Sequence, residues 1–127
     1  MRNLMWMGAL VALVGCGDKD SGDSAGDVTG EDFQAFVDAN CAGCHTGGGA
    51  NGGLALDDAV GSTVDVASAG LPSMVLVSPG SLDDSYLWHK LNDTQIDAGG
   101  TGDVMPTTGV LDDLSVVEDW ILAGAPE

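Results

Sequence analysis

The chain has 127 residues and a net charge of −17, because three Lys and Arg residues stand against 20 Asp and Glu residues. That length fits one small domain rather than a multidomain enzyme, and the charge argues against a nucleic-acid-binding protein, since phosphate contacts need clustered basic side chains. The 20 glycines and few aromatic residues predict a loop-rich fold. Its small apolar core needs an additional stabilising element, which the Cys and His residues are candidates to supply.

The N-terminal segment, residues 1–15, is predicted to be a signal peptide. Its apolar run, residues 4–14, follows Arg2 and is too short to cross a bilayer of ~30 Å, which takes about 20 helical residues. The run ends in Gly15 and Cys16 and resembles a bacterial lipobox, in which Cys16 becomes the lipidated first residue of the mature protein. The alternative is an ordinary signal peptide with an incidental cysteine.

The next segment, residues 16–30, is predicted to be a flexible acidic tether behind the lipidated Cys16. It is rich in Gly, Ser and Asp and has no aromatic residue, so it cannot bury enough surface to offset its ordering entropy. The folded domain is therefore expected to comprise residues 31–127.

The first predicted helix begins at a capping box formed by Thr29 and Asp32. Apolar residues at helical spacing follow it and carry the helix to about Asn40.

Two more helices are predicted further along the chain. One covers residues 81–91, with Ser81 as its cap, and the other covers residues 112–123 and stops at Gly124. The stretches between the helices, residues 46–80 and 92–109, are rich in Gly and are predicted to be loops. A short strand is expected within the first of them, at residues 75–77.

The most informative motif follows the first helix, where Cys41, Cys44 and His45 form a Cys-x-x-Cys-His pattern. Two thiols at this spacing can add to the two vinyl groups of a haem, and the adjacent His is then held at the iron. The pattern predicts covalent attachment of one haem c, and an export signal strengthens this prediction because bacteria attach haem outside the cytoplasm.

Three other interpretations of the motif remain open. A thiol–disulfide couple normally has its first Cys at a helix N-terminus, whereas this pair follows a helix. A zinc site would need a fourth ligand, and the distant His89 is a poor match for known zinc-site spacings. A Cys41–Cys44 disulfide with a purely structural role is the third.

Three further motifs support a family resemblance. Pro79-Gly80 leads into the predicted second helix, Met105-Pro106 follows a Gly-rich stretch, and residues 120–126 close the chain with a Trp-Ile-x-x-Gly-Ala-Pro pattern. In this order, and together with Cys-x-x-Cys-His, they resemble the small monohaem c-type cytochrome domains of secreted bacterial proteins. The stretch between Pro106 and the closing motif looks short for that family, so the last helix is expected to lose part of its first turn.

This resemblance implies a fold and a set of haem contacts. The fold would be an all-α, small cytochrome c-like helical domain wrapped around one covalently bound haem, with long Gly-rich loops. Cys41 and Cys44 would form the thioether bonds, His45 would be the proximal iron ligand and Met105 the distal one.

The residues themselves also favour Met105 as the distal ligand. A thioether is a soft ligand suited to low-spin iron, and Met105 lies in a polar loop where it would otherwise be an exposed hydrophobe. Met74 lies in an apolar run, where a core role is the simpler explanation. His89 on the second predicted helix, Met74, and an open sixth position remain alternatives.

These expectations indicate an electron carrier rather than an enzyme. An iron with both axial positions filled leaves no place for a substrate, so the chemistry would be one-electron transfer. The alternatives are a haem enzyme or sensor with an open sixth position, and a non-haem structural lipoprotein with a Cys41–Cys44 disulfide.

The acidic surface and the N-terminal segment predict the surroundings of the protein. A net charge of −17 favours a redox partner with a basic docking patch, or alternatively serves solvation in a saline habitat. The signal peptide and Cys16 predict a periplasmic or other extracytoplasmic location with a lipid anchor in a membrane.

Overall fold

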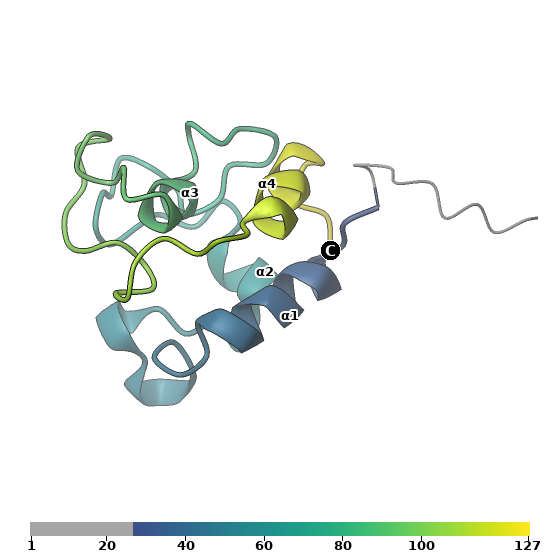
Figure 1. The fold of residues 1–127 in the computed structure, drawn as a ribbon, viewed down its shortest axis with the longest axis horizontal. Helices are drawn as coiled ribbons and strands as arrows, with labels where there is room; N and C mark the ends of the chain where they lie inside the picture. The colour runs from purple at the N-terminus through teal and green to yellow at the C-terminus, as the bar shows by residue number, and fades with distance from the viewer. Residues whose placement is uncertain (1–26) are drawn as a thin grey trace, which may run out of the picture.

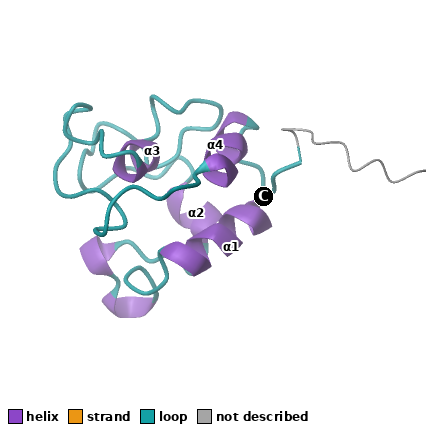
Figure 2. Cartoon of the chain, in the orientation of Figure 1, coloured by secondary structure: helices purple, strands orange, loops and turns teal. Residues whose placement is uncertain are grey.

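A computed structural model describes residues 27–127, and within this range the chain is helical with no strand (Figure 1, Figure 2). The signal peptide, Cys16 and most of the expected tether lie outside the described residues. The helical class of the prediction is thus confirmed for residues 27–127. The elements are α1 Gly30–Asn40, the 3₁₀ turns η1 Gly47–Gly49 and η2 Asn51–Gly53, α2 Ala59–Thr63, α3 Tyr86–Leu91 and α4 Ser115–Leu122.

Helix α1 begins and ends where the sequence predicts. The Thr29 main-chain N–H and hydroxyl both donate to Asp32 Oδ2, at 2.9 and 2.8 Å, and the Asp32 N–H donates back to Thr29 Oγ1. These hydrogen bonds, first from the main chain and then from the hydroxyl, lower the pKa of the Asp32 carboxyl. The capping box is therefore confirmed.

The core lies where α1 packs against α4 and α2 (Figure 1). The rings of Phe33 from α1 and Trp120 from α4 stack with centroids 3.9 Å apart and planes 8° from parallel. Trp120 is fully buried, and its indole Nε1 donates to the Pro126 carbonyl at 2.8 Å. The other buried members of this cluster are Val37, Leu56, Ala59, Val77, Leu91, Val117, Ile121 and Ala125.

The stretch between α1 and α3 is more ordered than a plain loop. Asp58 caps the short helix α2, since its Oδ1 accepts from the Gly61 N–H at 3.0 Å. The expected strand at residues 75–77 is wrong. Val75 and Val77 instead form isolated bridges with three separate partners, because the segments beside them are too irregular to continue a ladder.

Helix α3 begins later than the predicted residue 81. Ser81 still caps a turn, with its hydroxyl accepting from the Asp84 N–H at 3.3 Å, but the N–H groups of Tyr86 and Leu87 donate back to Val75 and Leu76. These hydrogen bonds replace the helical ones that residues 82 and 83 would have accepted. Helix α3 can therefore begin only at Tyr86.

Helix α4 begins at Ser115 rather than at residue 112, in line with the expected loss of its first turn. The Asp113 carboxylate accepts from the Ser115 hydroxyl at 2.6 Å and from its N–H at 2.9 Å, which holds residues 113–115 in a turn and lowers the pKa of Asp113. The predicted stop is confirmed, because Gly124 has a φ of 97°, which favours glycine.

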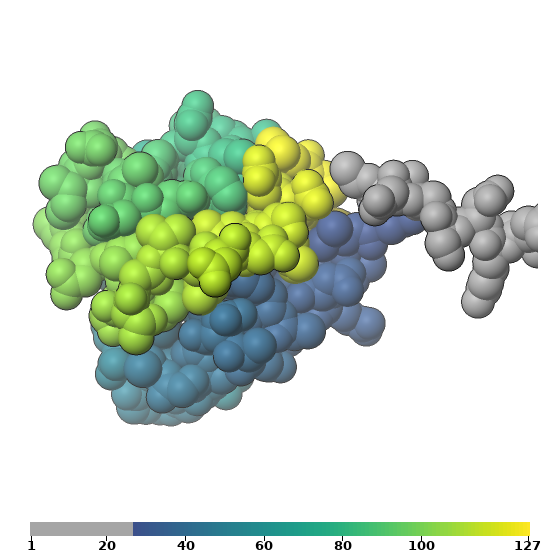
Figure 3. Space-filling model, in the orientation of Figure 1, coloured from purple at the N-terminus to yellow at the C-terminus, as the bar shows by residue number. Residues whose placement is uncertain are grey.

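The segment between α3 and α4 crosses one face of the molecule (Figure 3). As predicted, residues 92–109 contain no helix or strand and consist of turns, bends and irregular chain. Within residues 27–127, no helix has both the length and the apolar character needed to cross a bilayer.

Candidate haem site

The Cys-x-x-Cys-His motif forms a tight turn that continues directly from α1. The main-chain N–H groups of Cys44 and His45 both donate to the Cys41 carbonyl, at 3.1 and 3.0 Å. Cys41 and His45 are half-buried, whereas Cys44 is exposed. The helix end and the turn together fix the relative positions of the three predicted haem contacts.

The chain then loops out and returns to the same turn. The Leu56 N–H donates to the His45 carbonyl at 2.6 Å, and the Asn51 N–H donates to the Cys44 carbonyl at 2.9 Å. Gly52 and Gly53 adopt φ values of 65° and 73°, which side-chain-bearing residues rarely adopt. The Gly-rich sequence here lets the loop close back on the motif.

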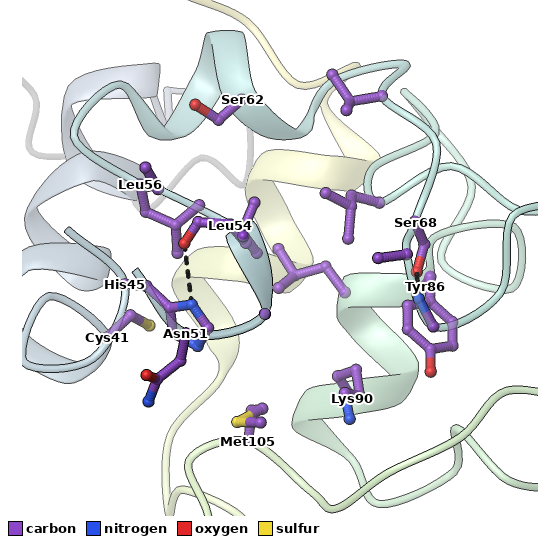
Figure 4. A pocket seen from close by; sticks show the side chains of 18 of the residues that line it. Cys41, His45, Asn51, Leu54, Leu56, Ser62, Ser68, Tyr86, Lys90 and Met105 are labelled. Carbon is purple, nitrogen blue, oxygen red and sulfur yellow. Dashed lines mark hydrogen bonds between the residues drawn. The ribbon is translucent and has the colours of Figure 1, made fainter. Parts of the chain in front are cut away.

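This returning loop orients the His45 ring. Its Nδ1 lies 3.1 Å from the Leu54 carbonyl oxygen, and a carbonyl can only accept, so Nδ1 carries the proton (Figure 4). In the neutral ring the lone pair then resides on Nε2. An imidazole held through one nitrogen by a carbonyl is the usual arrangement of a metal-ligating histidine.

A cavity of about 700 Å³ opens beside this turn (Figure 4). Cys41 and His45 line it on one side, and α3 and the segment after it line the other. The cavity size falls in the ~300–1,000 Å³ range of small-molecule and cofactor sites, which are mostly apolar. Its apolar lining is Leu54, Ala55, Leu56, Val66, Ala67, Ala69, Leu76, Leu87 and Leu91.

Met105, the predicted distal ligand, lines the same cavity as Cys41 and His45 (Figure 4). It is half-buried, and its main-chain N–H donates to the Lys90 carbonyl of α3 at 2.9 Å. Two axial ligand types that lie 60 residues apart in the sequence, His45 and Met105, are therefore brought to one apolar space.

His89 is placed elsewhere and has both ring nitrogens engaged. Its Nε2 donates to the Asp83 carbonyl at 2.8 Å, and its Nδ1 lies 2.9 Å from the Thr94 hydroxyl. It is not among the residues that line the cavity. Iron ligation by His89 would require these hydrogen bonds to break and the ring to move.

Met74 also lies away from the cavity lining, but its expected core role is wrong in part. It is half-buried and does not belong to the main core cluster, whereas its neighbours Leu76 and Val77 are buried. Met74 lies in a bend directly before Val75, which forms isolated bridges.

The two thiols of the motif are free in the structure. Burial raises the pKa of the Cys41 thiol, whereas a catalytic dithiol needs a depressed thiol pKa. Within residues 27–127, no three His, Cys, Asp or Glu side chains are grouped to hold a metal ion. A haem iron does not require such a group, because the porphyrin supplies its equatorial ligands.

These residues fit a haem c. The cavity is of cofactor size and mostly apolar, His45 presents a free Nε2, Met105 offers a soft sulfur, and Cys41 stands at the cavity wall. Cys44 is at the surface beside them and is not a lining residue.

Comparison with known proteins adds no relative: no family model, no curated protein and no solved structure matches this chain.

Sequence reasoning missed two kinds of residue at this site. Leu54 acts through its main-chain carbonyl, which leaves no signal in the side-chain pattern. Lys90 lines the cavity, and its side-chain ammonium donates to main-chain carbonyl oxygens of the segment before Met105. Of the three Lys and Arg residues of the chain, only Lys90 lies within residues 27–127, and that scarcity was the one available signal.

Proposed function

We propose that the protein is a monohaem c-type cytochrome that carries single electrons. The observation that supports this most is that His45, Met105 and Cys41 line one apolar cavity, and that His45 Nδ1 donates a hydrogen bond to the Leu54 carbonyl. In this proposal Cys41 and Cys44 would hold the haem covalently, and His45 and Met105 would ligate its iron. The bound haem would supply a reversible one-electron couple at its iron.

The protein's own residues would bind, orient and shield the cofactor. The hydrogen bond from His45 Nδ1 to Leu54 fixes the ring orientation and raises the basicity of Nε2. The leucine and alanine side chains of the lining would exclude water from the cofactor. Less solvent would then have to reorganise when the charge of the iron changes. With both axial positions filled, no substrate would reach the iron, so we assign no catalytic residue.

The test is the absorption spectrum of the full chain, produced in a host that attaches haem c. We expect low-spin bands that stay with the protein after acid–acetone extraction, because thioether bonds resist it. The double variant Cys41→Ala/Cys44→Ala is expected to lose haem from the protein fraction under the same extraction, and Met74→Leu is the matched control outside the site.

Each other spectrum supports a different function. A colourless protein would contradict the proposal and favour the structural lipoprotein with a Cys41–Cys44 disulfide. High-spin bands from a covalently bound haem would favour a haem enzyme or sensor.

The proposal includes an extracytoplasmic location and a lipid anchor at Cys16. Both rest on the N-terminal sequence pattern, with the residues between Cys16 and Thr29 as the tether between lipid and domain. The expected end of the tether at residue 30 is wrong, because Thr29 caps α1 and Gly30 is its first, buried residue.

The partner in this proposal carries a basic docking patch, in accordance with the net charge of −17. We expect the bimolecular rate of electron transfer with such a partner to fall steeply as salt shortens the Debye length from ~10 Å at 0.1 M to ~3 Å at 1 M. Stopped-flow rates across this range provide the measurement. An anionic small-molecule oxidant is the control, because its rate should rise with salt, and a flat response with the basic partner would favour the solvation role.

A further inference from the structure

The segment that carries Met105, residues 101–105, has no helix or strand of its own. If Met105 is an iron ligand, something outside this segment must hold its sulfur at the cavity. One such contact is the main-chain hydrogen bond from the Met105 N–H to the Lys90 carbonyl, at 2.9 Å. We call residues 101–105 the distal segment.

The Lys90 side chain makes the next contacts with the distal segment. Its Nζ donates to the Asp103 carbonyl at 2.6 Å and to the Thr101 carbonyl at 3.3 Å. Hydrogen bonds from an ammonium are about twice as strong as neutral ones. Lys90 also lines the cavity beside Met105, so its charged end spans from α3 to the distal segment (Figure 4).

These partners of Lys90 are unusual for so acidic a chain. The net charge is −17, yet the ammonium bonds to two main-chain carbonyls and not to a carboxylate. A carbonyl contact fixes the backbone path itself, whereas a surface ion pair between flexible side chains fixes little. The geometry is that of a positioning contact.

Two neutral side chains reinforce the same path. The Tyr86 hydroxyl donates to the Thr101 carbonyl at 3.1 Å and accepts from the Thr101 N–H at 3.3 Å. Gln95 donates from Nε2 to the Gly102 carbonyl at 3.1 Å. Tyr86 and Gln95 are only 2% and 1% exposed, so these contacts start from fixed positions in the core.

We propose that Lys90 is a positioning residue that sets how tightly Met105 holds the sixth position of the iron. This inference rests on the proposed function. By holding the carbonyls of the distal segment, Lys90 lowers the population of states in which the Met105 sulfur has left the iron. Added ligands bind only to those states, so their apparent affinity measures the population.

The experiment titrates the oxidised, haem-loaded full chain with imidazole. In Lys90→Leu the aliphatic stem remains and the donors are lost, and we expect imidazole to bind about tenfold more tightly than in wild type. Leu is chosen over Met because a methionine at position 90 would add a second thioether to the cavity. The near-infrared charge-transfer band of the methionine–iron bond should weaken in the same variant.

Two variants separate positioning from charge. Lys90→Arg retains the charge and the hydrogen-bond donors. Its imidazole affinity and its methionine–iron band should be close to those of wild type. Ala35→Glu changes the net charge by the same one unit at an exposed residue of α1, which packs against α2 and α4, and should bind imidazole as wild type does. If Ala35→Glu matched Lys90→Leu, charge and not contact would be responsible, and the inference would be wrong.

Tyr86→Phe keeps the test decisive if Lys90→Leu fails to fold, because it removes one hydroxyl and leaves the ring in place. It should tighten imidazole binding by a smaller factor than Lys90→Leu. Unchanged affinity in both variants, with the methionine–iron band present in wild type, would overturn the role of Lys90 and leave the proposed function intact. A wild-type protein without haem would instead overturn the proposed function.

Discussion

Replacing Met105 with Ala is expected to open the sixth position of the iron. The variant should lose the near-infrared methionine–iron band and bind imidazole about 10- to 1,000-fold more tightly than wild type, because no internal ligand competes. Its reduction potential should fall, since the soft thioether that favours ferrous iron is gone. Absorption spectra, an imidazole titration and a redox titration measure the three effects.

Matched controls for this variant come from the two rejected ligands. His89→Ala should leave the ligation spectrum intact, because both ring nitrogens of His89 already have hydrogen-bond partners outside the cavity. Met74→Leu conserves volume away from the cavity lining and should also change nothing. A change of ligation in His89→Ala, with none in Met105→Ala, would make the protein a bis-His carrier of lower potential. No change in any of the three variants would move the open-site enzyme or sensor to first place.

Replacing Trp120 with Ala is expected to cost about 3–5 kcal/mol of unfolding free energy. The indole is fully buried, stacks on Phe33 at 3.9 Å and donates to the Pro126 carbonyl at 2.8 Å. Its loss would leave a cavity between α1 and α4 and an acceptor without its donor. Urea unfolding of the haem-loaded protein, followed by far-UV circular dichroism, measures the change.

Trp120→Phe is the graded control, because it keeps a ring against Phe33 and removes only the N–H donor and part of the volume. Its destabilisation should be clearly smaller. If Trp120→Ala unfolded at the same urea concentration as wild type, the contact between α1 and α4 would contribute little, and the haem would carry the fold.

Elements with a complete local signal could be predicted from the sequence. Helix α1 has its capping box and apolar spacing within residues 29–40, and Gly124 stops α4 through its own conformational freedom. Helix starts that depend on distant backbone could not be predicted. The start of α3 is set by the Val75 and Leu76 carbonyls, which take the N–H groups of Tyr86 and Leu87.

The candidate site shows the same division. Cys41, Cys44, His45 and Met105 are visible in sequence because side-chain chemistry singles them out, and three of the four line the cavity. Helix α2 and the role of Lys90 were not predicted. The first is too short for a periodic signal, and the second acts through carbonyls whose positions exist only in the folded chain.

The cavity walls come from three stretches of chain, residues 41–56, 62–76 and 86–105, and the first and the last each contribute one axial ligand of the proposed cytochrome. A group bound by both ligands would link these two stretches. Reduction of that group and unfolding of the chain would therefore be coupled in one thermodynamic cycle. Since sulfur binds ferrous iron more firmly than ferric iron, reduction would strengthen the link between the two stretches and oxidation would weaken it. The oxidised protein would then unfold at a lower denaturant concentration than the reduced protein. The difference between their unfolding free energies would equal the difference in reduction potential between the folded and unfolded chains, expressed as a free energy.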